Sequence, residues 1–443
     1  MIRESDASFI ADAVRCGDCV SVVGFSNMGK STLLRELCTP NIRRQLLGNS
    51  ADDYLFVYID CNLMTERSEQ ALHETTVRVV LTALTRLGAQ ADLLGKLNNL
   101  YHQVVEPATP IRGPLAFDDA LREVCEQSGR KLVLLFDEFD DPFEALASRA
   151  FLNLRALKDQ LGQTLTYITA TERSLSSIRD DREAAEFAEL FDTREKWIGF
   201  LSQTDTQALA EELTQGHNAT PYDIGFITRQ AGGHSGLIEA VTDVWQRIAS
   251  GAPDPARTEA LELTAQALDD QTTVRTECAK LWAQLSEDER ATLTSHFAGI
   301  RTERSTLAKL QQKRILPSDG NPQDACPGDV WRAFVKRQAL AVQGLKPGIV
   351  VDVDSGEVFV DGHKSEPLTD LEYKMLLLLY GRLNKVVDKY TIVTNVWGET
   401  YLNEVDDARI EKLISRLRSK LEPGVTEPKY LTTLRGRGYR LVS

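Results

Sequence analysis

The sequence has 443 residues, of which 42% are hydrophobic, so the chain is long enough to form several domains that each bury a core. Its 65 Asp and Glu residues outnumber 51 Lys and Arg residues and give a net charge of −14, so contacts with nucleic acid need a local basic region. It contains no long apolar run and no basic, apolar leader, and we expect a soluble, cytoplasmic protein without a membrane partner. Its seven cysteines are scattered, and Cys16 and Cys19 lack a second pair that would complete a zinc site.

The first motif runs from Gly24 to Ser31 and fits G-x-x-x-x-G-K-[ST], the pattern of a loop that holds nucleotide phosphates. An apolar segment at 21–23 predicts a strand before it, and 31–37 predicts a helix after it, as this loop requires. In such a loop Lys30 reaches the β- and γ-phosphates, and Ser31 binds Mg²⁺. A glycine-rich turn without a ligand is the alternative. The predicted nucleotide-binding residues here are Gly24, Asn27, Met28, Gly29, Lys30, Ser31 and Thr32.

An acidic pair follows a second apolar segment further along the chain. The run 132–136 is continuous and apolar, as in a parallel strand that is covered on both faces. Its carboxyl end brings Asp137 and Glu138 to the edge of the sheet where ligands bind in open α/β folds. We predict that Asp137 holds Mg²⁺, partly through water, and that Glu138 is the catalytic residue that polarises the attacking water. The alternative is a buried strand followed by an acidic, solvated loop.

Two more apolar segments, 54–61 and 164–170, predict strands of the same sheet. Stretches with a helical spacing of apolar residues separate the strands, and this alternation predicts a doubly wound parallel sheet. The second segment ends near Thr169 and Thr171, where P-loop ATPases often have a polar residue that senses the γ-phosphate. We take Thr171 as a nucleotide-binding candidate, and an ordinary polar cap at a strand end is the alternative.

A Gly-Gly-His turn at 232–234 precedes a further predicted helix. The order of phosphate loop, acidic strand end, threonine-bearing strand end and Gly-Gly-His turn resembles that of STAND-class ATPases, which are signal-transducing relatives of the AAA+ and origin-recognition ATPases. Members often have proline where this chain has Ser235. The resemblance implies a helical lid in which His234, or its backbone, lies near the nucleotide. The alternative is a helix-capping turn with an exposed histidine.

The next segment, 257–345, has a mostly helical pattern that includes a capping box at Ser286 and Glu289. A turn cluster rich in Pro, Gly, Asp and Asn follows at 317–327. The segment resembles the inner winged-helix domain that follows the lid in many STAND and origin-recognition ATPases. That resemblance implies a domain that packs on the ATPase core and reports the nucleotide state.

The C-terminal segment has a different pattern. Its run at 348–362 alternates apolar and polar residues, as in a small antiparallel sheet, and Thr369 with Glu372 forms a capping box at a helix start. The segment resembles the winged-helix DNA-binding domain of OmpR/PhoB-type response regulators over the whole of 348–443. The resemblance implies a second helix before Trp397, a recognition helix at 409–421 and a wing hairpin at 430–440.

The charge of this segment supports nucleic-acid binding without reference to a family. Between positions 409 and 440, nine Lys and Arg face three Asp and Glu, a local balance of +6 in an acidic chain. We expect Arg416 to contact a base edge and Lys412 and Arg418 to contact phosphates. A winged helix used for protein contacts is the alternative. The predicted DNA-binding residues are Arg409, Lys412, Ser415, Arg416, Arg418, Thr433, Arg435, Arg437 and Tyr439.

Together these patterns predict a multidomain α/β protein. The predicted domains are a doubly wound P-loop NTPase core at 1–200, a helical lid at 201–252, a mostly helical winged-helix domain at 257–345 and a C-terminal α+β winged helix-turn-helix at 348–443. We predict an ATP-dependent, signal-transducing transcriptional regulator that uses ATP or ADP with Mg²⁺ and hydrolyses ATP slowly. Double-stranded DNA is the predicted partner, and a signalling protein and a nucleotide-dependent homo-oligomer are further expectations.

Rival functions follow from the same motifs. One is a replication or plasmid-maintenance ATPase, which would need an arginine finger that the sequence leaves open among Arg173, Arg182 and Arg194. Another is a defence-type sensor, and a third is a scaffold that holds nucleotide without turnover. The sequence shows neither a phospho-Asp receiver domain nor a repeat array, so we expect the signal to enter through a partner protein or through the nucleotide itself.

Overall fold

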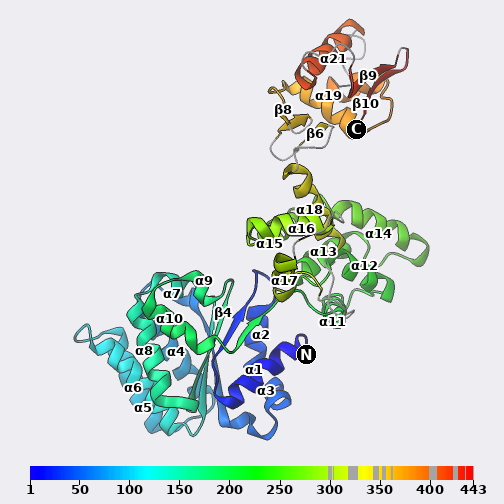
Figure 1. The fold of residues 1–443 in the computed structure, drawn as a ribbon. Helices are drawn as coiled ribbons and strands as arrows, with labels where there is room; N and C mark the ends of the chain where they lie inside the picture. Colours follow the sequence, from blue (N-terminus) through cyan, green and yellow to red (C-terminus); the bar gives the residue numbers. More distant parts are fainter. Residues whose placement is uncertain are drawn as a thin grey trace. The chain divides into compact units, whose positions relative to one another are not determined.

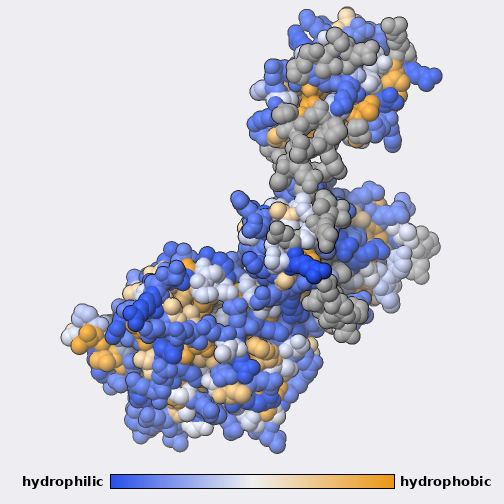
Figure 2. Space-filling model, in the orientation of Figure 1, coloured by the Kyte–Doolittle hydropathy of each residue, from blue (hydrophilic) through white to orange (hydrophobic). Residues whose placement is uncertain are grey.

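The computed structural model describes residues 1–297, 302, 304–317, 328–342, 349–351, 356–360, 363–398, 407–422, 428–434 and 436–442. The chain divides into two compact units, Met1–Phe334 and Val335–Ser443 (Figure 1). On the face shown in Figure 2, hydrophilic side chains cover most of the first unit, in keeping with the acidic composition. No helix within the described ranges is long and apolar enough to cross a membrane.

A five-stranded parallel sheet forms the centre of the first unit. Its strands are β1 (Val20–Val23), β2 (Tyr54–Asp60), β3 (Lys131–Asp137), β4 (Leu165–Thr171) and β5 (Glu195–Trp197). They lie in the order β2-β3-β4-β1-β5. Strands that are neighbours in the sheet but not in the sequence therefore require crossover connections. Every residue of β4 is buried, which explains the continuous apolar runs in the sequence. The predicted parallel sheet is confirmed.

Helices cover both faces of this sheet (Figure 1). One face carries α1 (Glu4–Cys16), α2 (Lys30–Leu37) and α3 (Pro40–Leu47). The following helices are α4 (Glu69–Arg86), α5 (Ala91–Val105), α6 (Arg112–Gln127), α7 (Asp140–Ala145), α8 (Ser148–Leu161), α9 (Leu175–Ile178) and α10 (Arg182–Ala188). The main core joins β2, β3 and β4 to α4, α6, α8 and α10, and it contains a group of aromatic rings that includes Phe136, Phe151 and Phe187.

The rest of the first unit is helical in the parts that the structure describes. The helices are α11 (Gln203–Leu213), α12 (Pro221–Ala231), α13 (Ser235–Ile248), α14 (Asp254–Leu268), α15 (Thr272–Ala283), α16 (Glu287–Phe297), α17 (Arg304–Gln312) and α18 (Asp329–Val342), the last of which extends past the boundary of the unit. The predicted capping box forms at the start of α16, where Ser286 and Glu289 exchange two hydrogen bonds of 3.0 and 3.2 Å. Most of the predicted turn cluster at 317–327 lies outside the described residues.

The second unit has the α+β winged-helix arrangement that the sequence predicts. A small antiparallel sheet of β6 (Ile349–Val351), β7 (Val358–Val360) and β8 (His363–Lys364) precedes α19 (Asp370–Tyr380), α20 (Lys389–Val396) and α21 (Asp407–Leu421). An antiparallel hairpin of β9 (Leu431–Leu434) and β10 (Gly438–Leu441) follows. Thr369 and Glu372 form the predicted capping box at the start of α19.

A buried carboxylate links three distant segments of the first unit. Asp6 on α1 is only 2% exposed, and its oxygens lie 3.2 Å from Arg3, 3.3 Å from Lys196 and 2.9 Å from Arg314. The carbonyl oxygen of Arg314 also accepts a hydrogen bond of 3.0 Å from the backbone N–H of Phe200. Since one carboxylate compensates several cations, these segments depend on one another for their stability.

Replacing Asp6 with Ala should lower the free energy of unfolding by about 3–5 kcal/mol, because the buried Arg3 loses its charged partner. Asp12 on the same helix makes an exposed ion pair with Arg15, so Asp12→Ala should cost less than about 1 kcal/mol. Urea unfolding of both variants measures the difference. Equal losses would contradict the role assigned to Asp6.

Candidate nucleotide site and nucleic-acid interface

The segment 24–31, here called the phosphate loop, connects β1 to α2 and lines a cavity of about 590 Å³. Gly29 and Asn27 both have positive φ angles, 86° and 57°, and this turns the backbone before α2 begins at Lys30. Gly24 is needed for a different reason, which is close packing. A Cβ atom at this position would lie 2.3 Å from the carbonyl oxygen of Ile198. Of the predicted residues, Asn27, Met28, Gly29, Lys30, Ser31 and Thr32 line the cavity, and Gly24 holds the loop against the segment after β5.

The side chain of Lys30 lies against the backbone of the loop that precedes it. Its side chain is 6% exposed, and its Nζ donates to the carbonyl oxygens of Gly24 and Phe25 at 2.6 and 3.1 Å. Burial lowers the pKa of Lys30, and the carboxylate of Glu138 opposes this shift. The ammonium group therefore lies against the backbone carbonyls at the start of the phosphate loop.

The acidic pair lies at the carboxyl end of β3. Asp137 is 1% exposed, and its two oxygens accept hydrogen bonds from the hydroxyl of Tyr58 (2.6 Å) and from the backbone N–H of Glu138 (3.1 Å). Glu138 itself lines the cavity and has a positive φ of 55°, an unusual conformation for a residue other than glycine. Burial raises the pKa of Glu138, and the nearby Lys30 opposes this shift.

The strand order places β4 between the phosphate loop and the acidic pair. Thr171 lies beside Val23 at the end of β1, and Thr169 lies beside Phe136 on β3. Both threonines are 0% exposed, and neither hydroxyl has a hydrogen-bond partner among the described residues. The backbone of Thr171 contacts the phosphate loop, because its carbonyl oxygen accepts a hydrogen bond of 3.0 Å from the N–H of Gly24.

The Gly-Gly-His turn brings the start of α13 to the phosphate loop. Ser235 and Gly236 line the cavity, and the N–H of Gly236 donates to the carbonyl oxygen of Asn27 at 3.3 Å. The His234 side chain is 1% exposed, and its Nδ1 accepts a hydrogen bond of 3.0 Å from the N–H of Leu237. His234 therefore caps α13, as the alternative interpretation held, but it is buried rather than exposed.

Three contacts to the loop were not predicted from the sequence. The carboxylate of Glu277 on α15 accepts from the Asn27 amide at 2.7 Å, and the Gln284 amide oxygen accepts from the N–H of Ser26 at 3.0 Å. The Arg3 guanidinium donates to the carbonyl oxygen of Met28 at 2.6 Å. No sequence signal reveals these partners, because more than twenty residues separate each one from the loop.

The remaining wall of the cavity combines apolar and acidic side chains from several helices. The apolar residues are Ile2, Leu33, Leu201, Leu209, Leu213 and Ala240. The acidic residues are Glu36, Glu212, Glu239, Asp243 and Glu277. Apolar walls suit a flat ring, and carboxylates accept hydrogen bonds from amino or hydroxyl groups.

The donor atoms near the loop suit a hard cation. The Ser31 hydroxyl and the Asp137 carboxylate are oxygen ligands, which Mg²⁺ prefers. Within the described parts of the chain, no group of three or more His, Cys, Asp or Glu side chains could hold a metal ion by itself. A magnesium ion at this place would therefore take most of its ligands from phosphates and water, which is its usual mode of binding.

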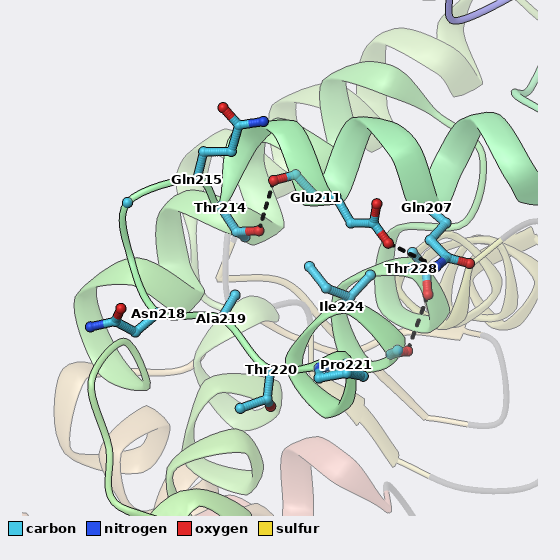
Figure 3. Close-up of a pocket in the computed structure, with 12 residues that line it drawn as sticks. Gln207, Glu211, Thr214, Gln215, Asn218, Ala219, Thr220, Pro221, Ile224 and Thr228 are labelled. Carbon is cyan, nitrogen blue, oxygen red and sulfur yellow. Dashed lines mark hydrogen bonds between the residues drawn. The ribbon is translucent and has the colours of Figure 1, made fainter.

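A second cavity, of about 550 Å³, lies between α11 and α12 (Figure 3). Three of its polar side chains make hydrogen bonds within their own chain segments. Gln207 donates to Glu211 at 2.8 Å, and the hydroxyls of Thr214 and Thr228 donate to backbone carbonyl oxygens. We assign no ligand to this cavity.

The polar face of α21 is exposed. Its buried side is formed by Ile410, Leu413, Ile414, Leu417 and Leu421. The side chains of Arg409, Lys412, Ser415, Arg416 and Ser419 are exposed on its other side. On the hairpin, Thr433 and Arg437 are also exposed, whereas Arg435 lies outside the described residues.

Two predicted DNA contacts have other partners in the structure. The Arg418 guanidinium donates to the carbonyl oxygen of Leu431 at 2.8 Å and also to the Thr433 hydroxyl, so it fixes the hairpin to α21. Tyr439 is 3% exposed and packs in the core of the domain. The prediction for Tyr439 as a DNA contact is therefore corrected, because the alternation of side chains along β10 turns this ring inward.

The chain resembles known proteins in both of its parts. Residues 363–441 match the family described as "Transcriptional regulatory protein, C terminal". The response regulator ArlR of Staphylococcus saprophyticus is 38% identical over 108 residues, which are 24% of this chain and 47% of ArlR. The chain thus spans less than half the length of this curated relative.

Two solved structures resemble different parts of the chain. The DNA-binding domain of CpxR from E. coli is 37% identical, with a TM-score of 0.19, over 22% of this chain and 92% of that one. The Walker-type ATPase paby2304 of Pyrococcus abyssi is 14% identical, with a TM-score of 0.44, over 76% of this chain and 95% of that one. With the family match, the motifs and the strand order, the protein is a fusion of a P-loop NTPase-type core to a winged-helix domain of the transcription-regulator type.

Acidification should destabilise the first unit through its buried histidines. Burial lowers the pKa of His234 to about 4 and that of His73, which stacks on Phe117, to about 3. The unfolded chain therefore binds more protons below pH 6.5, and each histidine should cost about 2 kcal/mol of stability between pH 7 and pH 5. His234→Asn keeps a good helix cap, so its loss over this range should be about 2 kcal/mol smaller than that of the parent in urea unfolding. The exposed His102→Asn is the control, and a His234→Asn variant with the parental pH dependence would contradict this account.

Proposed function

We propose that this protein is an ATP-dependent transcriptional regulator in which the nucleotide state controls conformation or oligomerisation, and thereby the binding of promoter DNA. The observation that carries the proposal is that Asn27 of the phosphate loop contacts both the lid, through Gly236, and the following helical segment, through Glu277. A loop that holds phosphates is thus in direct contact with elements that could transmit a change.

The cavity supports the binding of a nucleotide with Mg²⁺. Lys30 and the backbone of the loop would hold the phosphates, and Ser31 and Asp137 would hold the metal. When bound, Mg²⁺ would neutralise phosphate charge during transfer of the γ-phosphoryl group. Glu138, which lines the cavity together with Lys30, would orient and polarise a water molecule. The unpartnered hydroxyl of Thr171 is our candidate for a group that responds to the γ-phosphate.

The acidic and apolar side chains in the cavity wall support our proposal that the nucleotide is an adenine nucleotide. Leu33, Leu209 and Leu213 offer apolar surface to a flat base. The carboxylates of Glu36 and Glu212 are acceptors for an exocyclic amino group or for ribose hydroxyls. ATP and ADP carry both kinds of donor.

Coupling between the loop and the helical segment has a physical route. Lys313, which follows α17, lies over the ring of Phe25 in the phosphate loop at 5.4 Å and over that of Trp197 at 5.3 Å. The adjacent Arg314 is tied to Asp6. Nucleotide can shift these contacts only if it binds two arrangements with different affinity, and DNA affinity must differ between the same arrangements.

The proposal is tested by DNA binding with ATP, with ADP and without nucleotide. We expect ATP to change the affinity or the footprint length at least several-fold relative to ADP, since coupling free energies are typically about 1–3 kcal/mol. Lys30→Ala should abolish the difference while leaving binding without nucleotide unchanged, and the exposed, distant Lys96→Ala is the matched control. Equal binding in all nucleotide states would contradict the proposed switch.

The exposed face of α21 generates a separate prediction about sequence recognition. Arg416→Ala should lower the discrimination between binding sites by about 1–3 kcal/mol, because we assign it to a base edge. Lys412→Ala should weaken all sequences alike and reduce the salt dependence by about one unit of slope, because we assign it to a phosphate. Binding measured at several salt concentrations distinguishes the two, with Lys374→Ala on α19 as the control. A loss of discrimination in Lys412→Ala alone would reverse the assignments.

A further inference from the structure

Tyr58 lies beside the acidic pair in the central sheet. Strand β2 is the parallel neighbour of β3, with Tyr58 opposite Leu135 and Asp60 opposite Asp137. The Tyr58 hydroxyl reaches along the sheet and donates to Oδ2 of Asp137 at 2.6 Å. A distance at the short end of the usual range is expected for a hydroxyl that donates to a carboxylate.

This hydrogen bond has a defined effect on the Asp137 carboxylate. The group is 1% exposed, and its other oxygen accepts from the N–H of Glu138 at 3.1 Å. Each oxygen thus has one donor, and these two donors fix the plane of the carboxylate. A carboxylate has about four acceptor positions, so lone pairs remain on both oxygens for a metal ion or its bound water.

Tyr58 also contacts α2, the helix that begins with the last residues of the phosphate loop. The guanidinium carbon of Arg35 on α2 lies 5.0 Å from the centre of the Tyr58 ring, within the range of a cation–π contact. Tyr58 therefore connects α2, which begins with Lys30 and Ser31, to the end of β3.

We infer that Tyr58 is a positioning residue for Mg²⁺ binding, which acts by orienting the Asp137 carboxylate. The inference rests on the proposed function, in which Asp137 and Ser31 hold the ion. A hydrogen bond to a metal ligand fixes that ligand's orientation, and its loss typically lowers metal affinity by about 10- to 100-fold. No sequence motif marks Tyr58, because its role follows from the pairing of β2 with β3.

The test is the Tyr58→Phe variant of the full chain, which keeps the ring on β2 and removes only the hydroxyl. The binding of a fluorescent ADP analogue is titrated against Mg²⁺, and binding without Mg²⁺ is measured separately. We expect the half-saturating Mg²⁺ concentration to rise about tenfold, and the affinity without Mg²⁺ to stay unchanged. Tyr101→Phe is the matched control, since the Tyr101 hydroxyl also donates to a carboxylate, that of Glu74, at 2.8 Å.

An unchanged Mg²⁺ titration in Tyr58→Phe, beside a parent that requires Mg²⁺, would overturn the inference and leave the proposed function intact. An equal loss of affinity with and without Mg²⁺ would overturn it too, because it would show a purely structural role. A parent that binds no nucleotide would instead refute the proposed function and the inference with it. If Tyr58→Phe does not fold, Arg35→Leu, which frees the ring from α2, should raise the Mg²⁺ requirement in the same direction, and no change there would overturn the inference.

Discussion

The phosphate loop is held by chain segments that lie far from it in the sequence, and the other features of the first unit depend on this arrangement. Arg3 contacts the Met28 carbonyl, Gly236 contacts the Asn27 carbonyl, and Glu277 contacts the Asn27 amide. The Met28 carbonyl lies in a buried part of the loop and needs such a partner, because an unpaired buried polar group costs about 1–3 kcal/mol. A change in the geometry of the loop would therefore alter its contacts with the N-terminal segment, α13 and α15.

The strand order determines which side chains lie near the phosphate loop. Because β4 lies between β1 and β3, the phosphate loop, Thr171 and the acidic pair meet along one edge of the sheet. The neighbouring β2 then contributes Tyr58 to the same edge. The phosphate loop and Glu138, which lie more than one hundred positions apart in the sequence, thereby line the same cavity.

Much of the sheet and the motif residues could be predicted from the sequence. Strands β2, β3 and β4 lie within one or two residues of the predicted segments, because buried parallel strands leave long apolar runs. The short strand β5 leaves no such pattern and was not predicted. The partners Arg3 and Glu277 were missed because their contacts depend on tertiary packing. Burial of Tyr439 was missed for the same reason, since charge and family position alone do not show which way a ring on a hairpin points.

Hydrogen–deuterium exchange of the full chain with and without ADP or ATP tests the central claim most directly. If the phosphate loop is the junction between the nucleotide and the helical segment, nucleotide should change protection in α15 and in residues 313–316 as well as in the loop and after β3. That pattern should be absent from a variant that cannot hold phosphates. A change confined to the loop and the acidic pair, with α15 unaffected, would contradict the account.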